Sequence, residues 1–174
     1  MPTPTKIRRP ALPSTPQFWE EWIWSRFPPN KYVIQPQAYG VTLEVNMGAV
    51  ATVDWPAFPA PFYCFRLAFV SWQTSDGDPT DFPVRIGIQY TNGNNWTSGV
   101  FASAIIVGNS GNAGFVPAYD WRLPRECAQN DVLTLTVDNT LNPAEAIQCD
   151  AMLWGYEVRT RTFPMPSVAF DQIR

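Results

Sequence analysis

Residues 131–158 constrain the fold more than any other part of this chain. In their first half, Leu133, Leu135 and Val137 alternate with polar residues, which is the period-two pattern of a strand with one buried face. The second half is a long apolar run without proline, and Gly155 inside it favours a central strand over a buried helix. The sequence DNTLNP between the halves supplies turn chemistry. We therefore predict an antiparallel pair of strands on which the other strands assemble.

The rest of the chain from residue 31 onward repeats the strand pattern. Short runs rich in Val, Ile, Phe, Tyr and Trp are separated by clusters of Pro, Gly, Asn and Asp, which is typical of a sandwich or a barrel. The helices that a parallel sheet needs for its crossover connections are missing from the pattern. We predict an all-β fold, an antiparallel β-sandwich, with strands at residues 32–34, 41–46, 49–53, 62–72, 84–90, 96–107, 115–119, 131–137 and 147–159.

One short helix is predicted near the N-terminus, over residues 16–27. Ser14 or Thr15 can cap it, Pro16 suits its first turn, and two consecutive prolines after residue 27 end it. Aromatic and aliphatic residues cover two adjoining faces of this helix, so it needs a hydrophobic seat. Two seats are consistent with the pattern: an end of the chain's own sandwich, or a pocket on a partner.

Proline-rich arms flank the β domain. Prolines at both ends of the chain remove backbone donors and favour extended geometry. The chain therefore divides into an arm with the short helix at 1–30, a β-sandwich domain at 31–160 and a tail at 161–174. Deletion of residues 1–27 is predicted to abolish assembly and to leave the domain folded. We expect the arms and the helix to bind other subunits through basic, aromatic and apolar residues: Arg8, Arg9, Phe18, Trp19, Trp22, Trp24, Phe163, Met165 and Phe170.

Composition and charge argue against several classes of function. The chain has 12 basic and 15 acidic residues without long runs of either, so it lacks the electrostatic footprint of a protein that binds nucleic acid or an anionic membrane. No run approaches the ~20 apolar residues of a membrane span, and the N-terminus lacks the apolar region of a signal peptide. Charged residues make up only 16% of the chain and aromatic residues 14%. We expect such a chain to bury part of its surface against another molecule.

Candidate catalytic and metal-binding groups are few. The sequence contains no histidine, and Cys64, Cys127 and Cys149 do not form a metal-binding motif, so we expect buried free thiols. The common nucleophilic triads, zinc sites and imidazole acid–base chemistry are therefore unsupported. A carboxylate enzyme would need facing acids, but most acids lie in predicted turns. The sequence DGDPTD at residues 76–81 lacks the spacing of an EF-hand calcium loop. We expect neither an enzyme nor a cofactor or metal site.

Tryptophan residues suggest a different class of function. Exposed indoles on a β-sandwich can stack on sugar rings, and Trp96 and Trp121 are the candidates because they lie near predicted loops. The alternative for both is a buried indole that seals the sandwich. Recognition of a host glycan or a polysaccharide by a carbohydrate-binding β-sandwich is therefore one function that the sequence allows, as the alternative to the assembly role of the arms.

The order of the strand sequences resembles that of a known class of proteins. The core reads FYCFRLAFVSW, PVRIGIQY, an Asn-Gly hairpin, YDWRLPREC, DVLTLTVDN and AMLWGYEV. Over residues 62–158 this order is similar to that of small jelly-roll structural proteins of tailed-bacteriophage virions. The resemblance implies a jelly roll and a non-enzymatic role in the virion, as a capsid cement or decoration protein, a minor capsid protein, or the base of a head fibre or vertex complex. It implies other virion proteins as partners and a homo-oligomer, and it carries over no catalytic residues.

Overall fold

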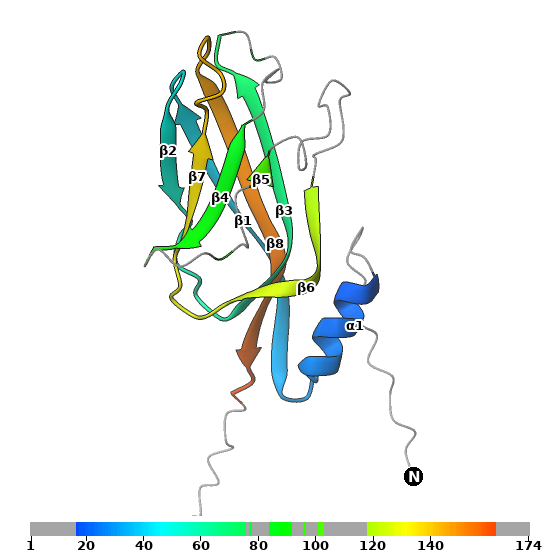
Figure 1. The fold of residues 1–174 in the computed structure, drawn as a ribbon. Helices are drawn as coiled ribbons and strands as arrows, with labels where there is room; N and C mark the ends of the chain where they lie inside the picture. Colours follow the sequence, from blue (N-terminus) through cyan, green and yellow to red (C-terminus); the bar gives the residue numbers. More distant parts are fainter. Residues whose placement is uncertain are drawn as a thin grey trace, which may run out of the picture.

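The structure, a computed structural model, describes residues 17–75, 77, 84–91, 96, 101–102 and 118–162. These residues form two antiparallel four-stranded sheets and one short helix, so the predicted all-β sandwich with an N-terminal helix is confirmed (Figure 1). The elements are α1 (Gln17–Arg26), β1 (Tyr32–Val45), β2 (Val50–Asp54), β3 (Phe62–Gln73), β4 (Arg85–Tyr90), β5 (Phe101–Ala102), β6 (Ala118–Cys127), β7 (Leu133–Asp138) and β8 (Ile147–Thr160). Sheet A has the strand order β1-β8-β3-β6, and sheet B has the order β2-β7-β4-β5.

The strand pairings are nested along the sequence. β1 pairs with β8, β2 with β7, β3 with β6 and β4 with β5. Two further pairings, β3 with β8 and β4 with β7, join these ladders into the two sheets. Each connection between consecutive described strands crosses from one sheet to the other, except the connection from β4 to β5. The two halves of the described chain therefore run antiparallel to each other along four successive strand pairs, and these pairs are distributed over the two sheets.

The two strands of residues 131–158 do not pair with each other, so the prediction of a strand pair was wrong. Both strands form, and both are central, but β7 lies in sheet B and β8 in sheet A. Between them, the buried amide of Asn139 donates Nδ2 hydrogen bonds to the carbonyls of Asn46 and Glu145, which fixes the crossing between the sheets. A period-two pattern shows which face of a strand is buried, but it does not identify the neighbouring strand.

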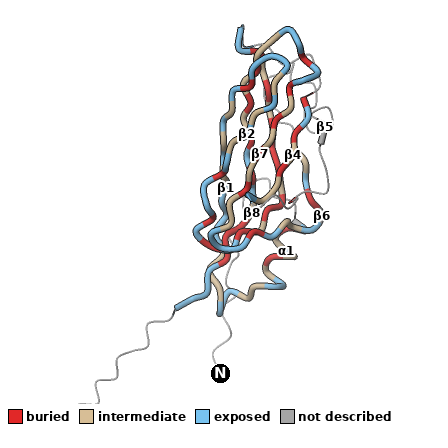
Figure 2. The backbone as a smooth tube through the Cα atoms, turned by 60° about the vertical axis from the view of Figure 1, so that its left-hand side comes forward, coloured by how far each residue is buried: buried red, intermediate tan, exposed pale blue. Residues whose placement is uncertain are grey.

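The core between the sheets follows the predicted alternation. In β7, every second residue is buried, and the intervening residues are partly exposed. β8 follows the same rule from Ile147 to Leu153, and Figure 2 shows the buried positions recurring along the strands. The cysteines Cys64, Cys127 and Cys149 are free and buried, as predicted.

Several predicted boundaries differ from those of the structure. β1 is continuous through residues 35–40, and Pro36 is tolerated there because β1 is an edge strand of sheet A. Residues 120–127, which fall between the predicted strands 115–119 and 131–137, belong to β6. The predicted strands 96–107 and 115–119 lie mostly outside the described residues, which include only Trp96, β5 and the start of β6 in these ranges.

α1 lies on the outer face of sheet A, near the ends where β1 begins and β8 ends (Figure 1). Trp19 and Ile23 are buried in a cluster with Phe65, Tyr156 and Val158. The rings of Trp19 and Phe65 have centroids 5.2 Å apart. Of the two seats that the sequence left open, the helix therefore occupies one on its own domain, although on the face of a sheet and not at an end of the sandwich.

A β-bulge in β3 creates part of this seat. The register shifts between Cys64 and Arg66, and Phe65 at the bulge joins the helix cluster while Cys64 belongs to the core between the sheets. Gly155 of β8 lies opposite the bulge, where a Cβ atom would lie 2.0 Å from the carbonyl oxygen of Tyr63. The predicted strand glycine is therefore a position of close backbone approach.

Candidate functional site

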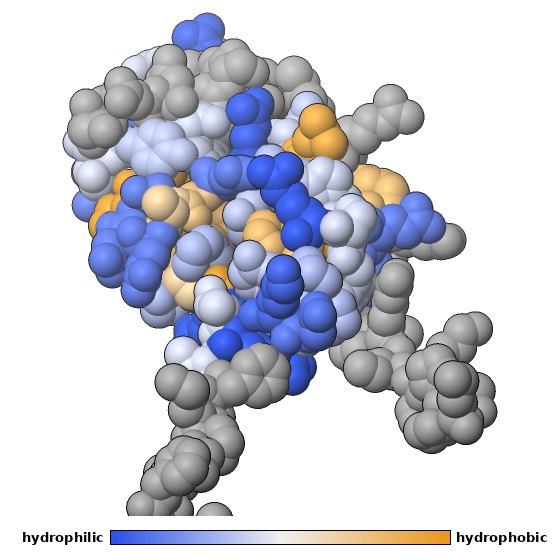
Figure 3. Space-filling model, turned by 90° about the horizontal axis from the view of Figure 1, so that it is seen from below, coloured by the Kyte–Doolittle hydropathy of each residue, from blue (hydrophilic) through white to orange (hydrophobic). Residues whose placement is uncertain are grey.

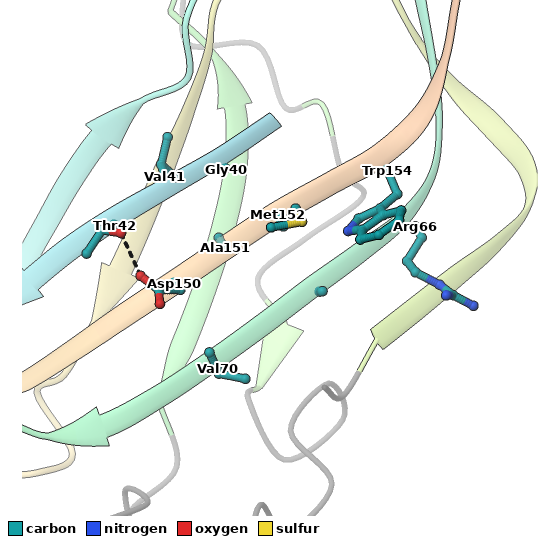
Figure 4. Close-up of a pocket in the computed structure, with 10 residues that line it drawn as sticks. Gly40, Val41, Thr42, Arg66, Val70, Asp150, Ala151, Met152 and Trp154 are labelled. Atoms are coloured by element: carbon teal, nitrogen blue, oxygen red, sulfur yellow. Dashed lines mark hydrogen bonds between the residues drawn. The ribbon is translucent and has the colours of Figure 1, made fainter. Parts of the chain in front are cut away.

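A hollow of about 530 Å³ lies on the outer face of sheet A (Figure 4). It is formed by β1, β3 and β8, the three strands that also carry the seat of α1. In β8, Ala151 and Leu153 point into the core, so Met152 and Trp154 point outward into the hollow. The larger side chains that line it include those of Thr42, Arg66, Val70, Asp150, Met152 and Trp154.

The centre of the hollow is apolar and accessible. The Trp154 side chain remains 46% exposed, and Met152 beside it is also exposed. The register places Ala68 of β3 opposite Met152 on one side and Gly40 of β1 on the other. These two small residues leave the ends of the longer side chains uncovered. Sheet A therefore presents a tryptophan and a methionine side by side to solvent.

The polar groups around the hollow are paired with one another. Arg66 donates two hydrogen bonds to Asp120, at 2.6 Å from Nε to Oδ1 and 2.9 Å from Nη2 to Oδ2. Its Cζ atom also lies 5.0 Å from the centre of the Trp19 ring. The hydrogen bonds to Asp120 raise the pKa of Arg66, so its guanidinium remains charged. Across the hollow, the Thr42 hydroxyl donates to Asp150 Oδ1 at 2.6 Å (Figure 4).

The predicted helix residues occupy different environments. Trp19 is buried, and Trp22 and Trp24 are partly buried against the same cluster. Phe18 is 42% exposed and is the member of this group with the most accessible side chain. The other predicted contact residues, Arg8, Arg9, Phe163, Met165 and Phe170, lie outside the described residues.

Trp96 and Trp121, the candidates for sugar stacking, are buried in the core cluster. Their ring centroids lie 5.4 Å apart in an edge-to-face pair, and Trp96 Nε1 is 3.4 Å from the carbonyl oxygen of Glu126. This placement matches the alternative of an indole that seals the sandwich. Trp154 is the most exposed tryptophan of the chain, and it is not among the residues predicted from the sequence. The alternation of β8 carries the signal, because an inward Leu153 requires an outward Trp154.

Other features add little to the identification of a site. Within the part of the chain that the structure describes, no group of three or more His, Cys, Asp or Glu residues is placed to hold a metal ion. Of the turn at residues 76–81, the structure describes only Gly77. No helix among the described residues is long and apolar enough to cross a membrane.

Comparison with known protein families and with curated proteins gives no match for this chain: no family model matches it, and no curated protein matches it significantly.

Proposed function

We propose that this protein is a non-enzymatic structural protein of a virion, made in the host cytoplasm, that stabilises or decorates a capsid or its vertex. The observation that carries the proposal is the nested pairing of eight strands in two four-stranded sheets. This pairing supports a jelly roll, the double-sheet fold that viral capsid domains share with lectins and cupins. The jelly-roll resemblance of the strand sequences points to the same class.

The outer face of sheet A is the proposed contact surface for a neighbouring subunit. Trp, Met and Arg are the residue types that protein–protein interfaces concentrate, and Trp154, Met152 and Arg66 meet at this hollow. A methionine also adapts its shape to a partner's side chains. The hollow can therefore accept an apolar side chain, while the Arg66–Asp120 pair forms part of a polar rim.

Carbohydrate binding is the alternative, and the same hollow is its best location. Trp154 would be the stacking residue, because Trp96 and Trp121 are buried. A sugar also needs donors and acceptors for its hydroxyl groups. At this hollow, the strongest of these groups already bond to one another, as Arg66 does with Asp120. The pairing of the polar groups therefore favours a protein partner.

The arms keep their proposed role in assembly, and the helix occupies a seat on its own domain, one of the two kinds of seat that the sequence left open. α1 anchors the N-terminal arm to its own domain, since Trp19 and Ile23 are buried against sheet A. Deletion of residues 1–27 would expose Phe65 and its neighbours as well as remove the arm. A truncation that separates assembly from folding therefore ends at residue 16.

Sedimentation velocity of the purified full chain tests the proposal. We expect self-association that is weakened at least ~10-fold by the double substitution Met152→Ser and Trp154→Ser, about 1.4 kcal/mol. Deletion of residues 1–16 should also weaken it. The matched control is Val50→Ser with Leu123→Ser, which removes two exposed apolar side chains elsewhere and should leave association unchanged.

The possible results separate the two functions. A wild-type chain that stays monomeric, and does not co-sediment with virus particles that lack it, would exclude the proposed assembly role. A glycan-array signal that disappears in Trp154→Ala would establish the carbohydrate alternative. Equal loss of association in the control would show that the outer face of sheet A has no special role.

A further inference from the structure

The β1 and β8 strands extend as a two-stranded ribbon beyond the rest of the sandwich (Figure 1). The ribbon end consists of residues 31–35 and 157–162, and at its base Glu157 still pairs with Phe62 of β3. The register pairs Tyr32 with Thr160 and Val33 with Arg159, and the Arg161 amide donates to the Lys31 carbonyl at 2.9 Å. Figure 3 views the molecule from this end and shows that hydrophilic side chains dominate the visible surface there.

The two faces of the ribbon end have different surroundings. Tyr32, Ile34 and Val158 belong to the cluster under α1. Because successive side chains alternate, Val33 and Arg159 belong to the opposite face. A groove of about 400 Å³ lies there, lined by Val33, Gln35, Arg159, Thr160, Arg161 and Thr162. This groove is separate from the hollow on the outer face of sheet A.

A buried carboxylate holds one wall of the groove in place. Glu157 is only 1% exposed, although its side chain is a carboxylate. The Tyr39 hydroxyl donates to Glu157 Oε1, and Arg159 Nη2 donates to Oε2 at 2.9 Å. Burial and the hydrogen bond to Glu157 raise the pKa of Tyr39, so it remains a neutral donor. Glu157 thus fixes the guanidinium of Arg159, whose side chain is 52% exposed at the groove.

Two further cations lie beside Arg159 without an acidic partner among the described residues. Lys31 and Arg161 are opposite each other in the ribbon, and both are exposed. The ion pairs within the described part of the chain involve Arg26, Arg66, Arg85 and Arg159 only. Arg159 and Arg161 line the groove, and Lys31 lies opposite Arg161 next to it. With one buried anion, these three cations leave local positive charge there, in a chain whose net charge is −3. The groove is therefore complementary to an anion that the described residues do not supply.

We propose that this groove binds an extended acidic segment of a partner protein. Arg159 and Arg161 are two residues apart in an extended chain, which separates their side chains by about 7 Å on one face. Carboxylates at alternating positions of another extended segment have the same spacing, and guanidinium groups bind carboxylates bidentately. Nucleic acid fits less well, because no aromatic residue lines the groove and bases bind single-strand sites by stacking.

The test uses a fluorescent peptide of alternating Glu and Thr, titrated with the full chain by anisotropy. We expect Lys31→Gln with Arg161→Gln to weaken peptide binding about 10-fold, or about 1.4 kcal/mol. These side chains are exposed and form no ion pair with a described acid. Arg161 Nε donates a long hydrogen bond, at 3.4 Å, to the Tyr32 carbonyl, so the fold should be little affected by its loss. Binding should also weaken as salt rises from 0.15 to 1 M, because the Debye length falls from about 8 to 3 Å.

The matched control is Arg85→Gln with Arg125→Gln, which changes the net charge equally and should leave peptide binding unchanged. Equal binding by Lys31→Gln/Arg161→Gln and the wild type would overturn the proposal. So would equal loss in the control, which would indicate attraction to net charge alone. Binding of a single-stranded DNA oligomer in preference to the peptide would overturn the proposal and identify nucleic acid as the ligand of the groove. None of these results depends on the virion role, which the self-association experiment tests separately.

Discussion

The seat of α1 on sheet A can be tested by truncating the side chain at its centre. Trp19 is 2% exposed, and it contacts both the Phe65 ring and the Arg66 guanidinium. Truncation of a buried tryptophan to alanine costs about 3 to 5 kcal/mol. We expect a value near the lower limit, about 3 kcal/mol, because a helix on an outer sheet face can relax toward the space that is left. This is a large share of the 5 to 15 kcal/mol of a typical domain.

Urea unfolding of the full chain measures this loss. With a slope of about 2 kcal/mol/M, Trp19→Ala should lower the urea midpoint by about 1.5 M. Phe18→Ala is the matched control, because this neighbouring ring is 42% exposed and should change the free energy of unfolding by about 0.5 kcal/mol or less. An unchanged midpoint for Trp19→Ala would refute the docking of α1 on its own sheet. That result would instead favour the second kind of seat that the sequence allowed, a pocket on a partner.

Three further predictions use the same unfolding assay. Gly155→Ala should cost more than about 4 kcal/mol, because its Cβ would overlap the Tyr63 carbonyl; a loss below 1 kcal/mol would contradict this close approach. Asn139→Ala should cost about 2 kcal/mol, since it removes two hydrogen bonds to backbone carbonyls, and an unaltered midpoint would argue against them. Burial raises the pKa of Cys149 to about 12, so the unfolded chain releases this proton first and the free energy of unfolding should fall as pH rises above about 9. Cys149→Ala should make that fall shallower between pH 8 and 10.5, and an identical slope would speak against a buried thiol.

The sequence was sufficient to predict the class of fold, because the buried face of a strand is encoded locally. The alternation of Leu133, Leu135 and Val137 identified β7, and the short aromatic helix was located to within one residue at each end. Gly155 was correctly placed in a strand, and the structure adds that the β3 bulge brings backbone against it. Each of these signals lies within a few residues of the position it describes.

Pairing was not predictable in the same way, because strand partners are distant in the sequence. The turn chemistry after β7 suggested a hairpin, yet β8 pairs with β1 and β3 instead. Arg66 and Asp120 are 54 positions apart, and Tyr39 and Glu157 are 118 apart. No local pattern indicates that a glutamate in an apolar run will be buried against a distant tyrosine.

The candidate sites show the same division between local and distant information. Trp154 could have been identified from the β8 alternation as an outward aromatic residue, but the hollow around it needs the register of three strands. Trp96 and Trp121 were candidates for sugar stacking because they lie close to predicted loops in the sequence. Their burial depends on the packing of both sheets, which the sequence does not display.

The nested pairing has a consequence for the order in which the chain can fold. β1 is synthesised early, but its partner β8 is the last of the described strands to emerge, and the pair Tyr32–Thr160 closes a loop of more than a hundred residues. Until then, β1 and β3 have open edges that can pair with other chains. Contacts between such distant segments slow folding. A ribosome that stops before codon 147 would therefore release a chain with unprotected strands, and chaperone dependence should be greatest at that stage of translation.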